Sequence, residues 1–219
     1  MVRAGTDDEG PGLFTEPVEH SWEGHPGDSG TLGELHDAFA ECRRCPLGET
    51  RTKFVFGVGN PSATVLFVGE APGKDEDLQG EPFVGRAGKL LDKILEAIGW
   101  TREDVYIANI LKCRPPGNRN PEPAEIAACE GLLRRQIELV SPVILCTLGS
   151  FAAKTLLGTK EGIGALRGRI HEYRGIPLVP TYHPAALLRN PNWKKPTWED
   201  VQMLKAEHDK LVADSERAT

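Results

Sequence analysis

The chain has 219 residues, 39% of them hydrophobic and 26% charged, and a formal net charge of −6 at pH 7. This length is enough for one sizeable hydrophobic core, and the composition is that of a soluble globular protein. Neither an apolar run of roughly 20 residues nor the apolar core of a signal peptide is present, so we expect a cytoplasmic protein that does not bind membranes. We also expect a monomer.

The negative charge is concentrated at the start of the chain. Residues 1–40 hold nine acidic residues and one basic residue, which leaves a net charge of +2 on residues 41–219. Residues 159–197 hold seven basic and two acidic residues. A basic stretch of this kind suits a phosphate backbone, although a solvated loop has the same composition.

Residues 1–30 are rich in Gly, Pro, Asp and Glu and show no apolar period, so we expect a disordered acidic head and a single domain over residues 31–219. After the head, helical and strand patterns alternate. In chain order we expect a helix at 32–40, a strand at 65–68, a helix at 85–98, a strand at 105–111, helices at 123–139 and 150–157 around a strand at 143–148, strands at 169–173 and 178–182, and a helix at 197–213. This alternation predicts a three-layer α/β/α sandwich with a mainly parallel central sheet.

Four segments that carry polar residues or glycine lie at the ends of expected strands. They begin at Gly69, Asn109, Gly149 and His183. In parallel α/β sheets the binding sites gather at the carboxyl ends of the strands. We therefore expect the functional site at this edge of the sheet.

The chain contains five cysteines. Cys42 and Cys45 form a C-x-x-C pair, Cys113 and Cys129 follow separately, and Cys146 lies in an apolar strand as a buried structural thiol. In a reducing compartment the first four indicate a metal site before disulfides. Four thiolates can hold a [4Fe–4S] cluster or a structural zinc ion, and buried thiols without metal are the third alternative.

Four sequence segments in a fixed order resemble the family-four uracil-DNA glycosylases, the iron–sulfur branch of that superfamily. They are VGEAPGKDED at 68–77, QGEPFVGRAGKLL at 79–91, NILKCRPP at 109–116 and HPAALLR at 183–189. Together with the cysteine spacing, they extend the resemblance from about Cys42 to the C-terminal helix.

The resemblance implies a uracil-DNA glycosylase-like fold and a monofunctional glycosylase. Such an enzyme flips uracil out of single- or double-stranded DNA and hydrolyses the N-glycosidic bond, leaving an abasic site for base excision repair. The resemblance also implies a structural [4Fe–4S] cluster and favours it over zinc. Its ligands would be Cys42, Cys45, Cys113 and Cys129.

The resemblance assigns the reading of the base to Asn109 and the stacking surface to Phe83. An asparagine amide carries both a donor and an acceptor, as uracil O4 and N3–H require. The backbone of the strand-end loop can add donors to the pocket. We expect this loop to contribute Gly69, Ala71, Pro72 and Gly73.

Cleavage of the bond builds positive charge on the sugar and negative charge on the leaving uracil. We expect His183 to stabilise the uracil by a hydrogen bond to O2. Glu70, and after it Glu76, are the candidates for the carboxylate that faces the sugar and orients water. The family-one enzymes carry an aspartate one place after Glu70, where this chain has Ala71. We expect Asp77 to be a solvated loop charge.

The segment after His183 is expected to contact DNA. In the superfamily this loop fills the gap left by the flipped base with an apolar wedge. One of Leu187 and Leu188 should be that wedge and the other a core residue, and the sequence leaves open which. Phosphate contacts are expected from Arg189, Arg114 and Arg119.

Two other protein classes share some of these features. A non-enzymatic iron–sulfur or zinc module that binds nucleic acid would explain the cysteines and the basic stretch, but not Glu70, Asn109 and His183 at strand ends. A dinucleotide-binding enzyme would explain the glycines after the first strand. However, the spacing differs from the dinucleotide fingerprint, and Pro72 removes an N–H that a phosphate would need.

Overall fold

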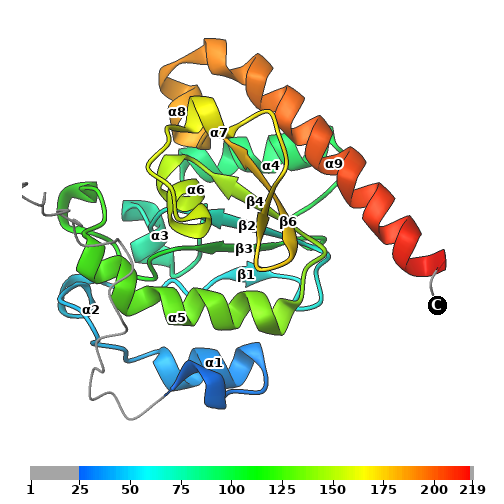
Figure 1. The fold of residues 1–219 in the computed structure, drawn as a ribbon. Coiled ribbons are helices and arrows are strands. Elements are labelled where there is room, and N and C mark those ends of the chain that lie inside the picture. The colour runs from blue at the N-terminus through cyan, green and yellow to red at the C-terminus, as the bar shows by residue number, and fades with distance from the viewer. Residues whose placement is uncertain (1–24, 218–219) are drawn as a thin grey trace, which may run out of the picture.

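The computed structural model describes residues 25–217 and contains a central sheet flanked by helices (Figure 1). The strands are β1 Val58–Gly59, β2 Val65–Gly69, β3 Tyr106–Asn109, β4 Ile144–Leu148, β5 His171–Tyr173 and β6 Ile176–Thr181. Their order in the sheet is β1-β3-β2-β4-β6-β5. The four inner strands are parallel and the two edge strands pair antiparallel, so the predicted mainly parallel sheet is confirmed.

The expected helices are all present, and shorter ones join them. The α-helices are α1 Leu32–Phe39, α2 Leu47–Thr50, α3 Lys74–Gln79, α4 Arg86–Ala97, α5 Pro123–Val140, α6 Ser150–Leu157, α7 Ile163–Leu166, α8 Pro184–Arg189 and α9 Lys194–Arg217. Three short 3₁₀ helices are η1 Pro26–Asp28, η2 Pro116–Asn118 and η3 Pro191–Trp193. Over residues 25–217, none of the helices has the length and apolarity that a membrane crossing needs.

The two faces of the sheet are covered by different helices, as the alternation of side chains along β2 shows. Leu66 and Val68 pack into the core that α5 and α6 complete. Val65 and Phe67 point to the other face and pack with Leu91 of α4 and with residues of α9. Helix α1 lies outside α5 (Figure 1). The three-layer arrangement follows from this period-2 burial.

The end of the expected disordered head is ordered. Pro26 is buried, and the Ser29 carbonyl accepts hydrogen bonds from Nε and Nη2 of Arg135 in α5, at 3.1 and 2.6 Å. The expectation of disorder is therefore wrong for residues 25–30, because a basic side chain of α5 binds their backbone. Residues 1–24 lie outside the described part of the chain.

The buried Asp200 carboxylate joins the first part of α9 to Arg167 after α7 and to the end of β6. The Asp200 carboxylate accepts two hydrogen bonds from Arg167, at 2.9 and 2.8 Å, and one from the Thr181 hydroxyl at 2.7 Å. The side chain of Asp200 is fully buried. Since Thr181 stands two residues before His183, this ion pair supports the strand end that carries the candidate histidine.

We expect Asp200→Ala to lower the free energy of unfolding by about 3–5 kcal/mol, because it removes the buried partner of the Arg167 guanidinium and leaves it only the exposed Glu199 carboxylate, 3.8 Å away. Urea unfolding at pH 7 measures the change. Glu161→Ala is the matched control, since its ion pair with Arg169 is exposed and should be worth at most about 1 kcal/mol. Equal losses in the two variants would contradict the structural role of Asp200.

Candidate active site

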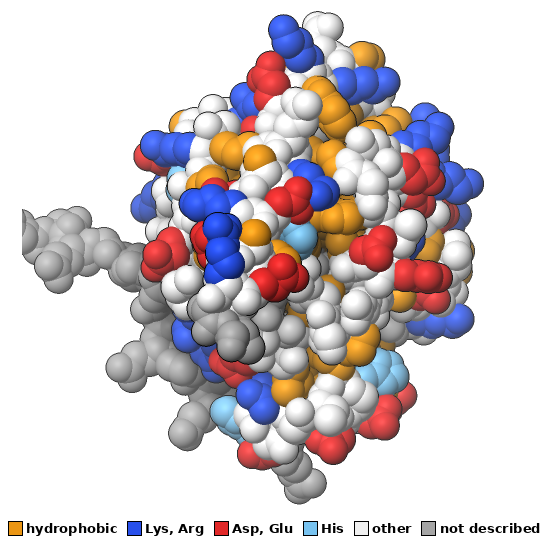
Figure 2. All heavy atoms as spheres, turned by 90° about the vertical axis from the view of Figure 1, so that its right-hand side faces the viewer, with side chains coloured by type: hydrophobic (Ala, Val, Ile, Leu, Met, Phe, Trp, Pro, Cys, Tyr) orange, Lys and Arg blue, Asp and Glu red, His pale blue; other side chains and the backbone are white. Residues whose placement is uncertain are grey.

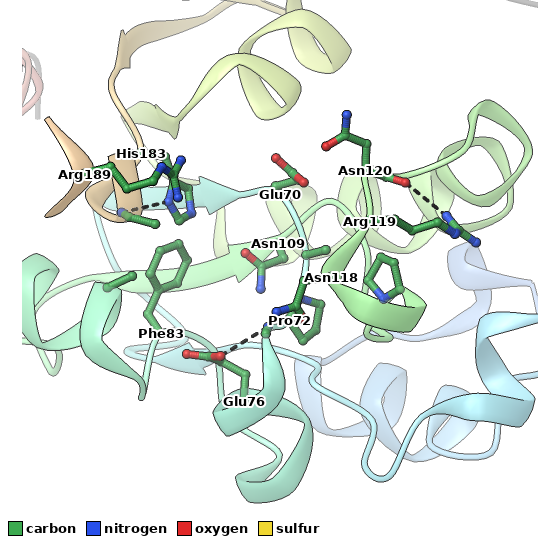
Figure 3. A pocket seen from close by; sticks show the side chains of 15 residues that line it. Glu70, Pro72, Glu76, Phe83, Asn109, Asn118, Arg119, Asn120, His183 and Arg189 are labelled. Atoms are coloured by element: carbon green, nitrogen blue, oxygen red, sulfur yellow. Dashed lines mark hydrogen bonds between the residues drawn. The ribbon is translucent and has the colours of Figure 1, made fainter. Parts of the chain in front are cut away.

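A pocket opens at the carboxyl ends of β2, β3 and β6, at the edge of the sheet where the sequence placed the site. Figure 3 shows Phe83 and His183 on one wall, Asn118 and Asn120 on the opposite wall, and Asn109 between them. The residues that line it are Glu70, Ala71, Pro72, Gly73, Glu76, Phe83, Ala87, Asn109, Pro115, Asn118, Arg119, Asn120, His183, Ala185 and Arg189.

Asn109 presents an unused acceptor to this pocket. Its side chain is 2% exposed, and its buried Oδ1 has no hydrogen-bond partner among the described residues. Burying an amide oxygen without a hydrogen-bond partner destabilises the protein, and a ligand that donates a hydrogen bond to it would remove this cost. Asn109 is therefore suited to bind a planar ligand through an N–H group.

Gly69 leaves the space that Asn109 and Phe83 occupy. A Cβ atom at this position would lie 2.3 Å from Asn109 Oδ1 and 2.6 Å from Phe83 Cζ. Both distances are far below van der Waals contact. The strand therefore has to end in glycine for the amide and the ring to meet in one pocket.

Phe83 is held in a strained backbone conformation. Its φ is 55°, which is uncommon for a bulky side chain. The Arg102 guanidinium donates to the carbonyls of Phe83 and Pro82, at 3.0 and 2.6 Å, and so fixes this turn. The Phe83 ring faces the His183 ring with 5.5 Å between centroids. Sequence reasoning missed Arg102, which carries no motif of its own and lies 19 residues away.

The two candidate glutamates have different surroundings. Glu76 caps α3 through Gly73 N–H at 3.1 Å, and its Oε1 accepts from the N–H groups of Val84 and Gly85, at 3.0 and 2.9 Å. The Glu70 carboxylate has no hydrogen bond or ion pair with any described residue, and burial raises its pKa above the usual range. Glu76 is thus committed to holding the loop, whereas Glu70 is free to act on a ligand or water.

Asp77 is not the solvated loop charge that the sequence indicated. It is buried, and its carboxylate accepts hydrogen bonds from the backbone N–H and the hydroxyl of Thr52, at 2.8 and 2.7 Å. This correction has a physical reason: α3 turns Asp77 inward, where it binds a segment that lies 25 residues earlier.

His183 is a neutral imidazole with a defined tautomer. Its Nδ1 accepts a hydrogen bond from Ala185 N–H at 3.1 Å, so the ring proton lies on Nε2. Burial, assisted by the positive charge of Arg189, lowers the pKa of His183 from 6.5 to about 4. Gly149 leaves room for this ring, since a Cβ there would lie 2.9 Å from His183 Cβ. The histidine can therefore donate from Nε2 at neutral pH without carrying a charge.

The structure separates the two leucines of α8. Leu187 is 2% exposed and lies in the protein, whereas Leu188 is 41% exposed. Leu187 is therefore the core residue, and Leu188 is left as the candidate for the predicted wedge. Arg189 next to it is exposed and lines the pocket.

The arginines of the loop before α5 bind protein groups. Arg119 donates to both carboxylate oxygens of Glu125, at 2.9 and 2.6 Å, and the Glu125 side chain is 3% exposed. Arg114 donates to Asn118 Oδ1 at 2.7 Å. The bidentate pairing argues against the predicted phosphate contact by Arg119, because its charge is already matched. Both arginines shape the loop that carries Asn118 and Asn120 to the pocket, and the phosphate contact expected of Arg114, which has no ion pair among the described residues, stays a prediction.

The basic stretch at residues 159–197 is also partly neutralised. Arg167 binds Asp200 and Arg169 lies 3.4 Å from Glu161. On the face of the molecule drawn in Figure 2, Lys and Arg side chains are interspersed with Asp and Glu. Two exposed arginines line the pocket, Arg119 and Arg189. Arg119 is paired with Glu125, whereas Arg189 forms no ion pair with a described residue.

The four cysteines of the predicted metal site surround one small cavity. They are Cys42, Cys45, Cys113 and Cys129, and all are free thiols. Burial raises the pKa of Cys113 to about 11 and that of Cys129 to about 12. Arg51 donates to Cys113 Sγ at 3.3 Å and to the Cys42 carbonyl at 2.6 Å.

This cavity shares no lining residue with the pocket, and apolar side chains such as Phe39, Phe54 and Leu132 complete it. Within residues 25–217, no three Cys, His, Asp or Glu side chains are arranged to hold a single metal ion. The donor set, four cysteine sulfurs in an apolar wall, is the kind that iron–sulfur clusters use. Cys146 is buried in β4, as predicted.

Comparison with known proteins places the chain among DNA repair enzymes. The family model of the uracil DNA glycosylase superfamily matches residues 56–202. A type-4 uracil-DNA glycosylase of Archaeoglobus fulgidus is 43% identical over 182 residues, covering 80% of this chain and 92% of that protein. Those of Saccharolobus solfataricus and Thermotoga maritima are 46% and 45% identical, each over 80% of this chain and over 85% and 96% of their own lengths.

We expect an NMR titration of His183 to give a pKa of about 4, against an ordinary value of 6.5. Between these two values the unfolded chain binds the proton more readily, so acidification should lower the free energy of unfolding. Arg189→Gln removes a nearby positive charge and should raise the pKa of His183. A pKa at or above 6.5 in the folded protein would contradict the neutral imidazole.

Proposed function

Because the chain belongs to the type-4 branch of the uracil DNA glycosylase superfamily, we propose that it is a monofunctional uracil-DNA glycosylase of base excision repair. It flips uracil out of DNA and hydrolyses the N-glycosidic bond, which leaves an abasic site. A non-enzymatic nucleic-acid-binding module would have no use for a pocket that brings Glu70, Asn109 and His183 together.

The observation that carries the proposal is the unpartnered Asn109 Oδ1 beside the Phe83 ring. Uracil is flat and offers N3–H as a donor and O4 as an acceptor. Asn109 accepts the first through Oδ1 and donates to the second through its NH₂ group, while Phe83 covers the face of the base. Cytosine presents an amine in place of O4, so the same amide cannot satisfy it in both positions.

Two polar groups of the pocket have atoms without a protein partner, and these groups act in the cleavage step. His183 Nε2–H donates to uracil O2 and stabilises the charge that develops on the leaving base. The Glu70 carboxylate stabilises the cationic sugar and orients the attacking water. Ala71 supplies no carboxylate, so this role rests on Glu70 in the present chain.

The DNA contacts that we propose lie on α8. Leu188 enters the stack in place of the flipped base, and Arg189 binds the backbone next to the pocket. Arg119 has a different role, since it binds Glu125 and holds the loop that forms the opposite wall. Uracil in single-stranded DNA needs no wedge, because a single strand has no base stack of a duplex in which a gap could open.

We also propose that Cys42, Cys45, Cys113 and Cys129 hold a [4Fe–4S] cluster. The support is the donor set: four free thiols from the N-terminal segment, the β3 end and α5 around one apolar cavity. A bound cluster would join these three segments and so support the loop that follows Cys113. Arg51 and Lys112 supply positive charge next to the sulfurs.

The proposed activity is tested with single- and double-stranded oligonucleotides that carry one uracil, followed by alkali cleavage at abasic sites. We expect cleavage only at the uracil. The preparation should be brown, with absorption at about 400 nm from iron–thiolate bonds. A cluster-loaded preparation that cleaves neither substrate would overturn the proposal.

We expect Asn109→Asp to reduce the discrimination between uracil and cytosine, because a carboxylate accepts a hydrogen bond from the cytosine amine. The measurement is the ratio of kcat/KM for the two bases in the same sequence context. A folded variant whose ratio equals that of the wild type would rule out Asn109 as the group that reads the base.

We expect Leu188→Ala to lower kcat/KM on duplex DNA at least about tenfold and to spare single-stranded DNA, because only the duplex leaves a gap to fill. Leu187→Ala is its matched neighbour and should instead lower the free energy of unfolding by about 2–5 kcal/mol, since Leu187 is buried. An equal loss of kcat/KM on duplex and single-stranded DNA in Leu188→Ala would contradict the role of Leu188 as the wedge.

A further inference from the structure

Lys112 lies between the two sites of the molecule. It stands three residues after Asn109 and directly before Cys113, and its side chain is 0% exposed. Its Nζ donates a hydrogen bond to the Asn109 carbonyl at 2.7 Å. Fully buried lysines are rare unless they are paired, so this side chain needs a partner that explains its position.

Lys112 has no counter-charge among the described residues. Over residues 25–217, no carboxylate forms an ion pair with its side chain. The hydrogen bond to the Asn109 carbonyl is thus the one polar contact of its Nζ within this part of the chain. Lys112 also stands directly before Cys113, which lines the cysteine cavity.

The orientation of the Asn109 side chain is set by the position of its backbone. No described residue accepts or donates a hydrogen bond at its amide group, and the buried Oδ1 has no partner. The bond from Lys112 is thus the one polar contact by which a side chain fixes Asn109 among the described residues. A shift of the Asn109 carbonyl would turn the amide away from a bound base.

From this geometry we propose that Lys112 is a positioning residue, whose buried Nζ holds the Asn109 backbone and so keeps the Asn109 amide in the orientation that reads uracil. The inference rests on the proposed function. Because Lys112 stands directly before Cys113, it lies between the pocket and the cysteine cavity, although the two share no lining residue. The alternative is a lysine that merely fills space.

The test compares Lys112→Met, which keeps an unbranched side chain one atom shorter and removes the ammonium, with Lys93→Met on the exposed side of α4. Absorption near about 400 nm checks that each variant retains its cluster. The first measurement is the affinity for an oligonucleotide carrying a fluorinated deoxyuridine that resists cleavage, against the matched cytosine oligonucleotide. The second is kcat/KM on uracil.

We expect cluster-loaded Lys112→Met to lose about 100-fold in kcat/KM and most of its binding preference for the uracil analogue over cytosine. Lys93→Met should match the wild type. In an Asn109→Ala background, Lys112→Met should cost less than about twofold, because the residue acts through Asn109. A residue that only fills space would lower activity by the same factor in both backgrounds.

Unchanged uracil preference in cluster-loaded Lys112→Met, or equal losses with and without Asn109, would overturn the inference. If Lys112→Met loses the cluster, Lys112→Leu, which also lacks a donor, takes its place in the same cycle. Loss of the cluster from both variants would show that Lys112 serves the cysteines alone and would also overturn it. A wild-type protein inactive on uracil would sink the proposed function instead.

Discussion

The hydrogen bonds between β2 and β3 continue beyond the ends of the strands, and the pocket depends on them. Ile110 N–H donates to the Gly69 carbonyl and Leu111 N–H to the Glu70 carbonyl, each at 3.0 Å. This continued pairing keeps Glu70 next to Asn109, although 38 positions separate them along the chain. Across the sheet, β4 and β6 end at the same edge and bring His183 to the other side of the pocket. Parallel strands share one direction, so groups with different chemistry gather at one edge.

This crowded edge requires backbone without side chains. Gly69 and Gly149 end β2 and β4, and a Cβ at either would collide with the groups that line the pocket. Gly88 has the same role at the start of α4, since a Cβ there would lie 1.6 Å from the Phe83 carbonyl. The strained backbone of Phe83 is thus held by close packing and by Arg102. Strain of this kind persists where the surrounding structure fixes it, as at binding sites.

Several charged side chains at the pocket and next to it hold loops in place. Glu76 binds three backbone N–H groups, Asp77 binds Thr52, and Glu125 binds Arg119. Against these satisfied groups, the free carboxylate of Glu70 and the unpartnered amide oxygen of Asn109 stand out. This difference between bonded and unbonded side chains has a physical basis, because a group that binds substrate needs hydrogen-bonding atoms that no protein group already occupies.

The sequence by itself determined the layers, the main helices and strands, and the edge where the site lies, because apolar periodicity and strand ends are local patterns. The ordered motifs also determined Asn109, Phe83 and His183 as pocket residues. Tertiary structure alone showed that Glu76 is bound to backbone N–H groups while Glu70 is not, and that Leu187 is buried while Leu188 is exposed. Each difference depends on which partners a side chain meets, and those partners lie on other elements. For the same reason the sequence missed the short helices α3 and α8, too brief for a periodic signal, and the roles of Arg102 and Lys112. A hydrogen bond to a distant backbone carbonyl leaves no local pattern in the chain.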